Sequence, residues 1–187
     1  GYTDEEWQFL QNQMICDLNE GYAIYRPRYI LPDYNVYIKK GCEFLELPAP
    51  KDLDEALDGL LILYSHVPSI TTFPVYIGRL DMLLDPFITD EEQDYIKIKR
   101  FLNHVYKTVP DSFCHANIGP YDTKAGRLIL KAVMELEAPT PNMTIRYDKS
   151  KTSREFAELA AKACLLVSKP SFANDAYYIS DLGEQYG

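Results

Sequence analysis

A cysteine followed directly by a histidine, Cys114-His115, is a pair whose residue types could carry out chemistry. An adjacent histidine can lower the pKa of a thiol and so turn the cysteine into a nucleophile. Side chains of sequence neighbours often point apart, however, and the sequence identifies no carboxylate that would orient the histidine. The favoured interpretation is a half-buried structural cysteine, in a loop that leads into a helix.

A second group of candidates is the run Gly78-Arg79-Leu80-Asp81, which follows a short strand-like stretch and opens a helical one. A glycine, an arginine and an aspartate at a strand-to-helix turn could hold an anion or a neighbouring loop. The simpler and favoured alternative is that Asp81 caps the helix while Arg79 makes a local ion pair.

The sequence predicts no metal site. Its four cysteines stand at positions 16, 42, 114 and 164, so none form a C-x-x-C pair, and the three histidines are not at metal-site spacing from them. Motifs of nucleotide binding, zinc proteolysis and serine hydrolysis (G-x-G-x-x-G, the P-loop, H-E-x-x-H and G-x-S-x-G) are also absent from the sequence. By motif alone the chain offers no complete catalytic set.

Composition narrows the class of protein. The 187 residues are 47% apolar and carry a net charge of −9, with no basic stripe of the kind that nucleic-acid binding requires. The longest apolar runs are too short to span a bilayer, and the chain opens with no secretory signal. We therefore expect a cytoplasmic protein with reduced cysteines, bound neither to nucleic acid nor to a membrane.

Capping signals followed by apolar residues at helical spacing predict five amphipathic helices. Their predicted extents are Thr3 to Gly21, Asp52 to Pro68, Thr89 to Val105, Asp122 or Thr123 to Leu136, and Thr152 to Val167.

Strand signals are fewer. Met143–Tyr147 alternates between apolar and polar residues and is the main strand predicted, with Phe73–Ile77 and Ala176–Ile179 as weaker candidates. Tyr34–Ile38 could pair as an edge strand, within a proline-rich stretch (27–50) that reads as an extended connection.

The helix–strand–helix order around residues 123–167 indicates an α/β unit with a parallel sheet. We expect a single region, with a helix and the proline-rich connection over 1–50 and helices with the strand 142–147 over 51–187. A single strand leaves the backbone N–H and C=O groups along both of its edges unpaired. Either more strands therefore lie in the irregular stretches, or further chain completes the sheet.

Three stretches, in the same chain order, resemble the glycyl radical enzymes of the pyruvate formate-lyase-like superfamily, most closely the YjjI-type branch. The first is Gly78-Arg79-Leu80-Asp81 followed by Asp85-Pro86-Phe87. The second is Pro141-Asn142-Met143-Thr144-Ile145-Arg146-Tyr147, similar to a barrel strand of that family. The third runs from Phe156 to Cys164 and continues in Phe172-Ala173-Asn174-Asp175. Together they span roughly residues 73–187.

The resemblance implies an α/β fold, as a helix-rich fragment of a ten-stranded α/β barrel. It also implies an enzyme of anaerobic metabolism, in which a radical stored on a glycine passes to a cysteine that abstracts hydrogen from a small molecule. A radical SAM activase would install that radical, and no other cofactor is expected. The family's "R-V-x-G" glycine motif is absent from this sequence, and none of its cysteines aligns with the family's cysteine loop.

In such a barrel, side chains on one face of a strand and at the strand ends line the substrate pocket. The resemblance therefore makes pocket candidates of five residues: Asn142, Thr144, Arg146, Asn174 and Asp175. Asparagine and aspartate beside a helix often only cap or turn, which is the alternative for the last two.

Since the glycine motif is missing and the chain begins with Gly1 rather than methionine, we expect an N-terminal or middle piece of a longer enzyme, inactive by itself. Its partners would be the rest of the same protein, or a complementary chain, and the activase; an oligomer is compatible with this. One alternative is a non-catalytic partner subunit or interaction module that completes a split enzyme. Another is an unrelated helical α/β domain that matches by chance.

Overall fold

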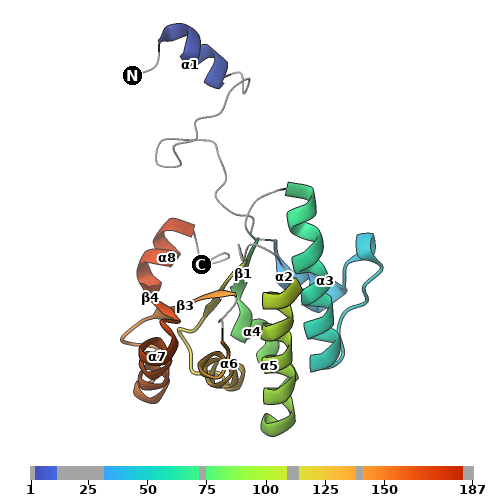
Figure 1. The fold of residues 1–187 in the computed structure, drawn as a ribbon, viewed down its shortest axis with the longest axis vertical. Helices are drawn as coiled ribbons and strands as arrows, with labels where there is room; N and C mark the ends of the chain where they lie inside the picture. Colours follow the sequence, from blue (N-terminus) through green and yellow to red (C-terminus); the bar gives the residue numbers. More distant parts are fainter. Residues whose placement is uncertain (1–2, 12–31, 72–74, 109–113, 138–140, 183–187) are drawn as a thin grey trace.

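Four strands and the helices that connect them form the larger part of the structure (Figure 1), a computed structural model that describes residues 3–11, 32–71, 75–108, 114–137 and 141–182. The elements are, in chain order, α1 (Asp4–Gln11), α2 (Tyr34–Lys40), the 3-10 turn η1 (Glu43–Leu45), α3 (Leu53–Thr71), β1 (Val75–Arg79), α4 (Leu80–Leu84), the 3-10 turn η2 (Asp85–Phe87), α5 (Glu91–Thr108), β2 (Cys114–Ile118), α6 (Lys124–Met134), β3 (Asn142–Tyr147), α7 (Arg154–Val167), β4 (Ser171–Asn174) and α8 (Asp175–Leu182).

The four strands form one sheet in the order β1-β2-β3-β4, and every neighbouring pair is parallel. The strand order follows the chain order, so each connection steps in the same direction. Since parallel crossovers are almost always right-handed, connections of this kind place their helices on one face of the sheet. The predicted α/β class with a parallel sheet is thereby confirmed.

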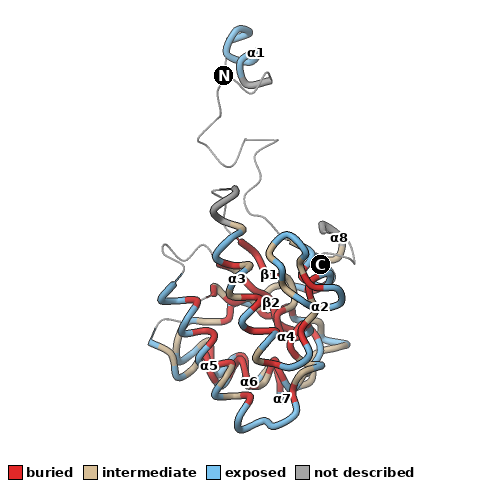
Figure 2. Tube along the Cα trace, turned by 90° about the vertical axis from the view of Figure 1, so that its right-hand side faces the viewer, coloured by how far each residue is buried: buried red, intermediate tan, exposed pale blue. Residues whose placement is uncertain are grey.

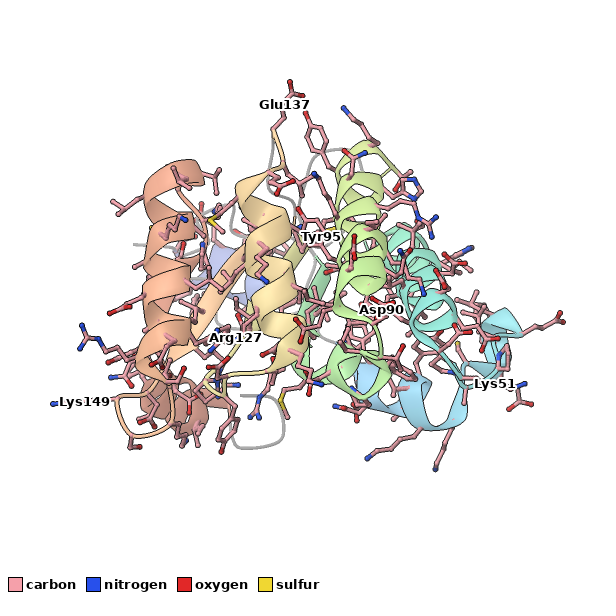
Figure 3. All side chains as sticks on the ribbon, turned by 90° about the horizontal axis from the view of Figure 1, so that it is seen from below. Lys51, Asp90, Tyr95, Arg127, Glu137 and Lys149 are labelled. Atoms are coloured by element: carbon pink, nitrogen blue, oxygen red, sulfur yellow. The ribbon has the colours of Figure 1, made fainter. Side chains whose placement is uncertain are left out.

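The helices on that face form a single layer. α5 packs between α3 and α6, and α6 packs between α5 and α7. Figure 3 shows these helices side by side, with the strands behind them. Apolar side chains of the strands, among them Ile77, Ala116 and Ile145, are fully buried against helix residues such as Leu102 and Ile129. This interface is the hydrophobic core, and buried residues gather there in Figure 2.

The helix starts follow the capping signals in the sequence. Thr123 accepts a hydrogen bond from the amide of Gly126 at the start of α6, and Ser153 accepts one from Phe156 at the start of α7. At α1, Glu6 and Thr3 form the reciprocal bonds of a capping box. The predicted part of this first helix beyond residue 11 lies outside the described residues, as does Phe73.

The segment Tyr34–Ile38 forms a helix, so its assignment as an edge strand is wrong. Asp33 caps α2 by accepting a hydrogen bond from the amide of Asn35 at 3.1 Å. Tyr34 and Tyr37, three residues apart, are buried together on one side of the helix. Burial of these two rings at helical spacing outweighs the strand preference of aromatic and β-branched residues.

The C-terminal candidate strand Ala176–Ile179 is also wrong, because these residues belong to α8. In addition, α3 continues past Pro68 to Thr71, although that proline was expected to end the helix. Further strands do lie in stretches that were predicted to be irregular, which was one of the two ways to complete the sheet. β2 occupies the predicted loop around Cys114, and β4 precedes α8.

Candidate functional site

The face of the sheet opposite the helix layer is polar, and we call it the polar face. Along each strand, core residues alternate with residues that point the other way. The second set comprises Tyr76 on β1, His115 and Asn117 on β2, Asn142, Thr144 and Arg146 on β3, and Ser171 and Ala173 on β4. The strand register brings them into rows, with Tyr76, His115 and Asn142 in one and Asn117, Thr144 and Ser171 in the next.

A buried ion pair ties this face to the start of α8. The guanidinium of Arg146 contacts the carboxylate of Asp175, and both side chains are almost fully buried. Lys151 reaches the same carboxylate with its Nζ 2.9 Å from Oδ2. Burial lowers the pKa of Arg146, as does the nearby charge of Arg79, while Asp175 acts in the opposite direction. Two of the predicted pocket residues, Arg146 and Asp175, are thus direct partners.

The turn from β1 into α4 holds the neighbouring loop. Asp81 lies within α4 rather than at its cap position, which Arg79 occupies. Its carboxylate accepts hydrogen bonds from the amide of Gly119 at 2.9 Å and from the Thr123 hydroxyl at 3.1 Å. Burial raises the pKa of Asp81 to about 6, against the lowering effects of these hydrogen bonds and of the charge of Arg79. Asp81 therefore holds the neighbouring loop and does not cap the helix, although the cap was the favoured alternative.

The Cys114-His115 pair is split between the two faces of the sheet. Cys114 is fully buried in the core, and burial raises the pKa of its thiol to about 12, so it is a structural residue and a poor nucleophile. His115 lies on the polar face, where its ring centroid is 6.4 Å from that of Tyr76. Burial, and then the charge of Lys169, lower the pKa of this histidine, which favours the neutral imidazole.

The other predicted pocket residues have different surroundings. Asn142 and Thr144 lie half-buried on the polar face, opposite His115 and Asn117 in the register. Asn174 is exposed, and its Oδ1 accepts a hydrogen bond from the amide of Ala176 at 3.0 Å. It therefore acts as a cap at the start of α8, and its contribution to a pocket stays a prediction.

Tyr76 and Asn117 are among the residues of the polar face that the sequence did not predict. Asn117 is 1% exposed, and its Oδ1 has no hydrogen-bond partner within the described residues. Recognising β2 as a strand would have found it, because Asn117 follows His115 by two positions and so shares its face.

Other parts of the described structure offer less. A depression of about 410 Å³ lies between α5 and α6, around Tyr95, Leu128 and Met134. Figure 3 labels Tyr95 on α5, in the helix layer. The described residues contain no group of three or more histidine, cysteine, aspartate or glutamate side chains that could hold a metal ion. Within the same ranges, none of the helices combines the length and apolar character that a membrane span needs.

Known proteins match the whole chain, beyond the residues 73–187 that carry the motifs. The chain is 92% identical, over all 187 residues, to an uncharacterized protein of Haemophilus influenzae, and it covers 36% of that protein. It is 48% identical over 167 residues to the uncharacterized protein YjjI of Escherichia coli, covering 88% of this chain and 32% of YjjI. The chain therefore spans about a third of the length of these relatives.

The family comparison covers the whole chain, including the stretches around Arg79, Arg146 and Asp175. The family described as "Glycyl radical enzyme YjjI-like" matches residues 1–187. This chain belongs to the YjjI-like glycyl radical enzyme family.

Proposed function

We propose that this chain is the part of a glycyl radical enzyme that builds one wall of its substrate cavity. In the full-length protein, a radical on a glycine would pass to a cysteine, and the resulting thiyl radical would abstract hydrogen from a small molecule bound at the polar face. Both radical residues would lie in the portion of the protein beyond this chain. The chain itself contributes scaffold and pocket side chains.

The observation that carries this proposal is the sheet order. Parallel strands in sequential order with helices on one face are the arrangement of an α/β barrel wall, in which the other face looks inward. Here that inward face carries polar and charged side chains, as a cavity wall does. We propose that the four strands belong to the ten-stranded barrel of this enzyme class.

The length of the relatives favours this role over that of a separate partner subunit. Both relatives carry the matched region within a chain about three times as long. A barrel wall and its radical residues would then belong to one polypeptide, with the radical SAM activase as a separate partner. The cytoplasm, where oxygen can be kept low in an anaerobic cell, would suit such a radical.

The test is electron paramagnetic resonance of the full-length protein after anaerobic treatment with its activase and S-adenosylmethionine. We expect a doublet from a carbon-centred radical. The doublet should be lost when the glycine of the C-terminal R-V-x-G motif is changed to alanine. A full-length protein that gives no radical under these conditions, while a known enzyme of the class does with its own activase, would refute the proposal.

A further inference from the structure

The middle two strands carry a patch of uncharged hydrogen-bonding side chains on the polar face. Asn117 on β2 pairs in the register with Thr144 on β3, and His115 pairs with Asn142. Neighbouring strands lie about 4.8 Å apart, and residues two positions apart on a strand share a face. The four side chains are therefore neighbours, and we call them the central patch.

Asn117 is the deepest member of the central patch. It is 1% exposed, and its Oδ1 has no hydrogen-bond partner within the described part of the chain. A buried amide oxygen without a partner is costly in free energy. Since buried polar groups are nearly always hydrogen-bonded, this oxygen calls for a donor that a bound molecule can supply.

The other members of the central patch can reach a ligand. His115, Asn142 and Thr144 are half-buried, so each keeps part of its side chain accessible. Burial lowers the pKa of His115, and a neutral imidazole donates from one ring nitrogen and accepts at the other. A threonine hydroxyl and an asparagine amide also both donate and accept. The patch therefore surrounds the Asn117 amide with groups that suit a ligand of mixed hydrogen-bonding character.

The charged side chains around the patch are engaged with one another. Arg146 and Lys151 both contact the carboxylate of Asp175, and Lys151 Nζ also lies 3.4 Å from Oδ2 of Asp148. An anionic ligand would compete with these two carboxylates for the same cations. A cationic ligand is disfavoured too, because the charge of Lys169 already acts on His115. The surroundings of the central patch thus favour an uncharged ligand.

We propose that the central patch binds a hydroxyl group of an uncharged, polyhydroxylated small molecule between Asn117 and Thr144. The ligand hydroxyl donates to Oδ1 of Asn117 and accepts a hydrogen bond from the Thr144 hydroxyl. A ketone or ether lacks the proton that Oδ1 requires. A hydroxyl also satisfies the amide after a flip of its oxygen and nitrogen, because it can accept as well as donate. This inference rests on the proposed function, since it names a substrate class for the proposed cavity wall.

Saturation-transfer difference NMR titrations of the full-length protein test the proposal. The probes are glycerol, 1,2-dimethoxyethane, which accepts hydrogen bonds but cannot donate them, and malonate, which is an anion. We expect glycerol to bind and the other two probes not to bind. Asn117→Ala should raise the Kd for glycerol at least about fivefold, because it removes the buried acceptor.

Two further variants complete the design. Thr144→Val keeps the shape of the side chain and removes its hydroxyl, so it should also raise the Kd, and it carries the test alone if Asn117→Ala does not fold. Asn103→Ala is the matched control, because Asn103 is an exposed asparagine on α5, in the helix layer on the other face of the sheet. Its Kd for glycerol should stay within about twofold of the unchanged protein.

Three results would overturn the inference. Glycerol could fail to bind at concentrations up to about 100 mM, the folded variants at Asn117 and Thr144 could bind it as Asn103→Ala does, or dimethoxyethane or malonate could bind and lose affinity in those same variants. The electron paramagnetic resonance experiment distinguishes failure of the proposed function itself. A protein that forms the glycyl radical but gives any of these three results retains the function and loses only this inference.

Discussion

Asp81 shows how a single buried carboxylate couples the sheet to its loops. Its side chain extends from α4 to the loop after β2, where it accepts a hydrogen bond from the amide of Gly119. Gly119 has a positive φ of 77°. A side chain at Gly119 would be strained at this φ, and its Cβ would lie 2.8 Å from the carbonyl oxygen of Arg146. The glycine thus allows the loop to approach both Asp81 and β3, and the aspartate fixes it there.

The raised pKa of Asp81 has a consequence for stability. Its folded-state pKa of about 6 exceeds the ordinary 3.8, so its contribution to stability is complete below pH 3.8 and is lost as the pH rises through about 6. That interval corresponds to roughly 3 kcal/mol, at 1.36 kcal/mol for each pH unit. Asp81→Asn should therefore become more stable relative to the unchanged protein as the pH rises from 4 to 7, measured by urea unfolding.

Asp122→Asn is the control for this prediction, because its sign is opposite. Arg127, followed by a hydrogen bond from Ser153, lowers the pKa of Asp122. Its contribution to stability is therefore present above its ordinary pKa and is lost as the pH falls through the lower, folded value. The loss in free energy of unfolding caused by Asp122→Asn should become smaller toward low pH. A difference between Asp81→Asn and the unchanged protein that stays constant from pH 4 to 7 would show that Asp81 is not buried as described.

At the scale of elements, the joint between α6 and α7 depends on one serine. Ser153 caps α7 by accepting a hydrogen bond from the amide of Phe156 at 3.1 Å. Its hydroxyl also donates to Asp122 at 2.5 Å, and Asp122 in turn pairs with Arg127 on α6. The cap is therefore also a link between neighbouring helices of the layer.

Ser153→Ala should lower the free energy of unfolding by about 1–2 kcal/mol, since it removes both the cap and the link. Ser153→Thr keeps the hydroxyl and should recover most of this loss. Urea unfolding of the two variants at pH 7 measures the difference. Equal stability of Ser153→Ala and Ser153→Thr would mean that neither hydrogen bond contributes.

Sequence reasoning predicted those elements whose signals are local. The starts of α6 and α7 follow from a capping residue before a helical apolar stripe, and β3 from alternation after Pro141. β2 also alternates, but over only five residues, and it carries alanine and asparagine, which are depleted in strands, so its strand signal was too weak to be recognised. α2 was missed because the sequence does not show that the rings of Tyr34 and Tyr37 are buried.

The site was predicted in part for the same physical reason. Arg146 and Asp175 came from the family resemblance, and the structure makes them an ion pair. Their distance in sequence hid this contact, which depends on β4 returning the chain beside β3. The proximity of Arg79 to Arg146 likewise needs the register across β2, which no local pattern contains.

At the scale of the whole molecule, one edge of the sheet and the helix beside it carry exposed apolar side chains. β4 is the last strand of the described sheet, and Phe172 on it is 47% exposed. Near the end of α7, Leu165 and Leu166 are 87% and 62% exposed. Exposed strand edges and apolar clusters of this kind favour association with further chain.

The relatives are about three times as long as this chain, so in the full-length protein we expect further chain to cover this edge. Hydroxyl-radical footprinting of the full-length protein measures the solvent accessibility of each of these side chains. Leu165, Leu166 and Phe172 should react slowly compared with Phe44, which is 82% exposed in η1 at the opposite end of the helix layer. Because a barrel continues by adding a strand to β4, fast labelling at Phe172 would mean that the sheet stops there and that the barrel proposal is wrong.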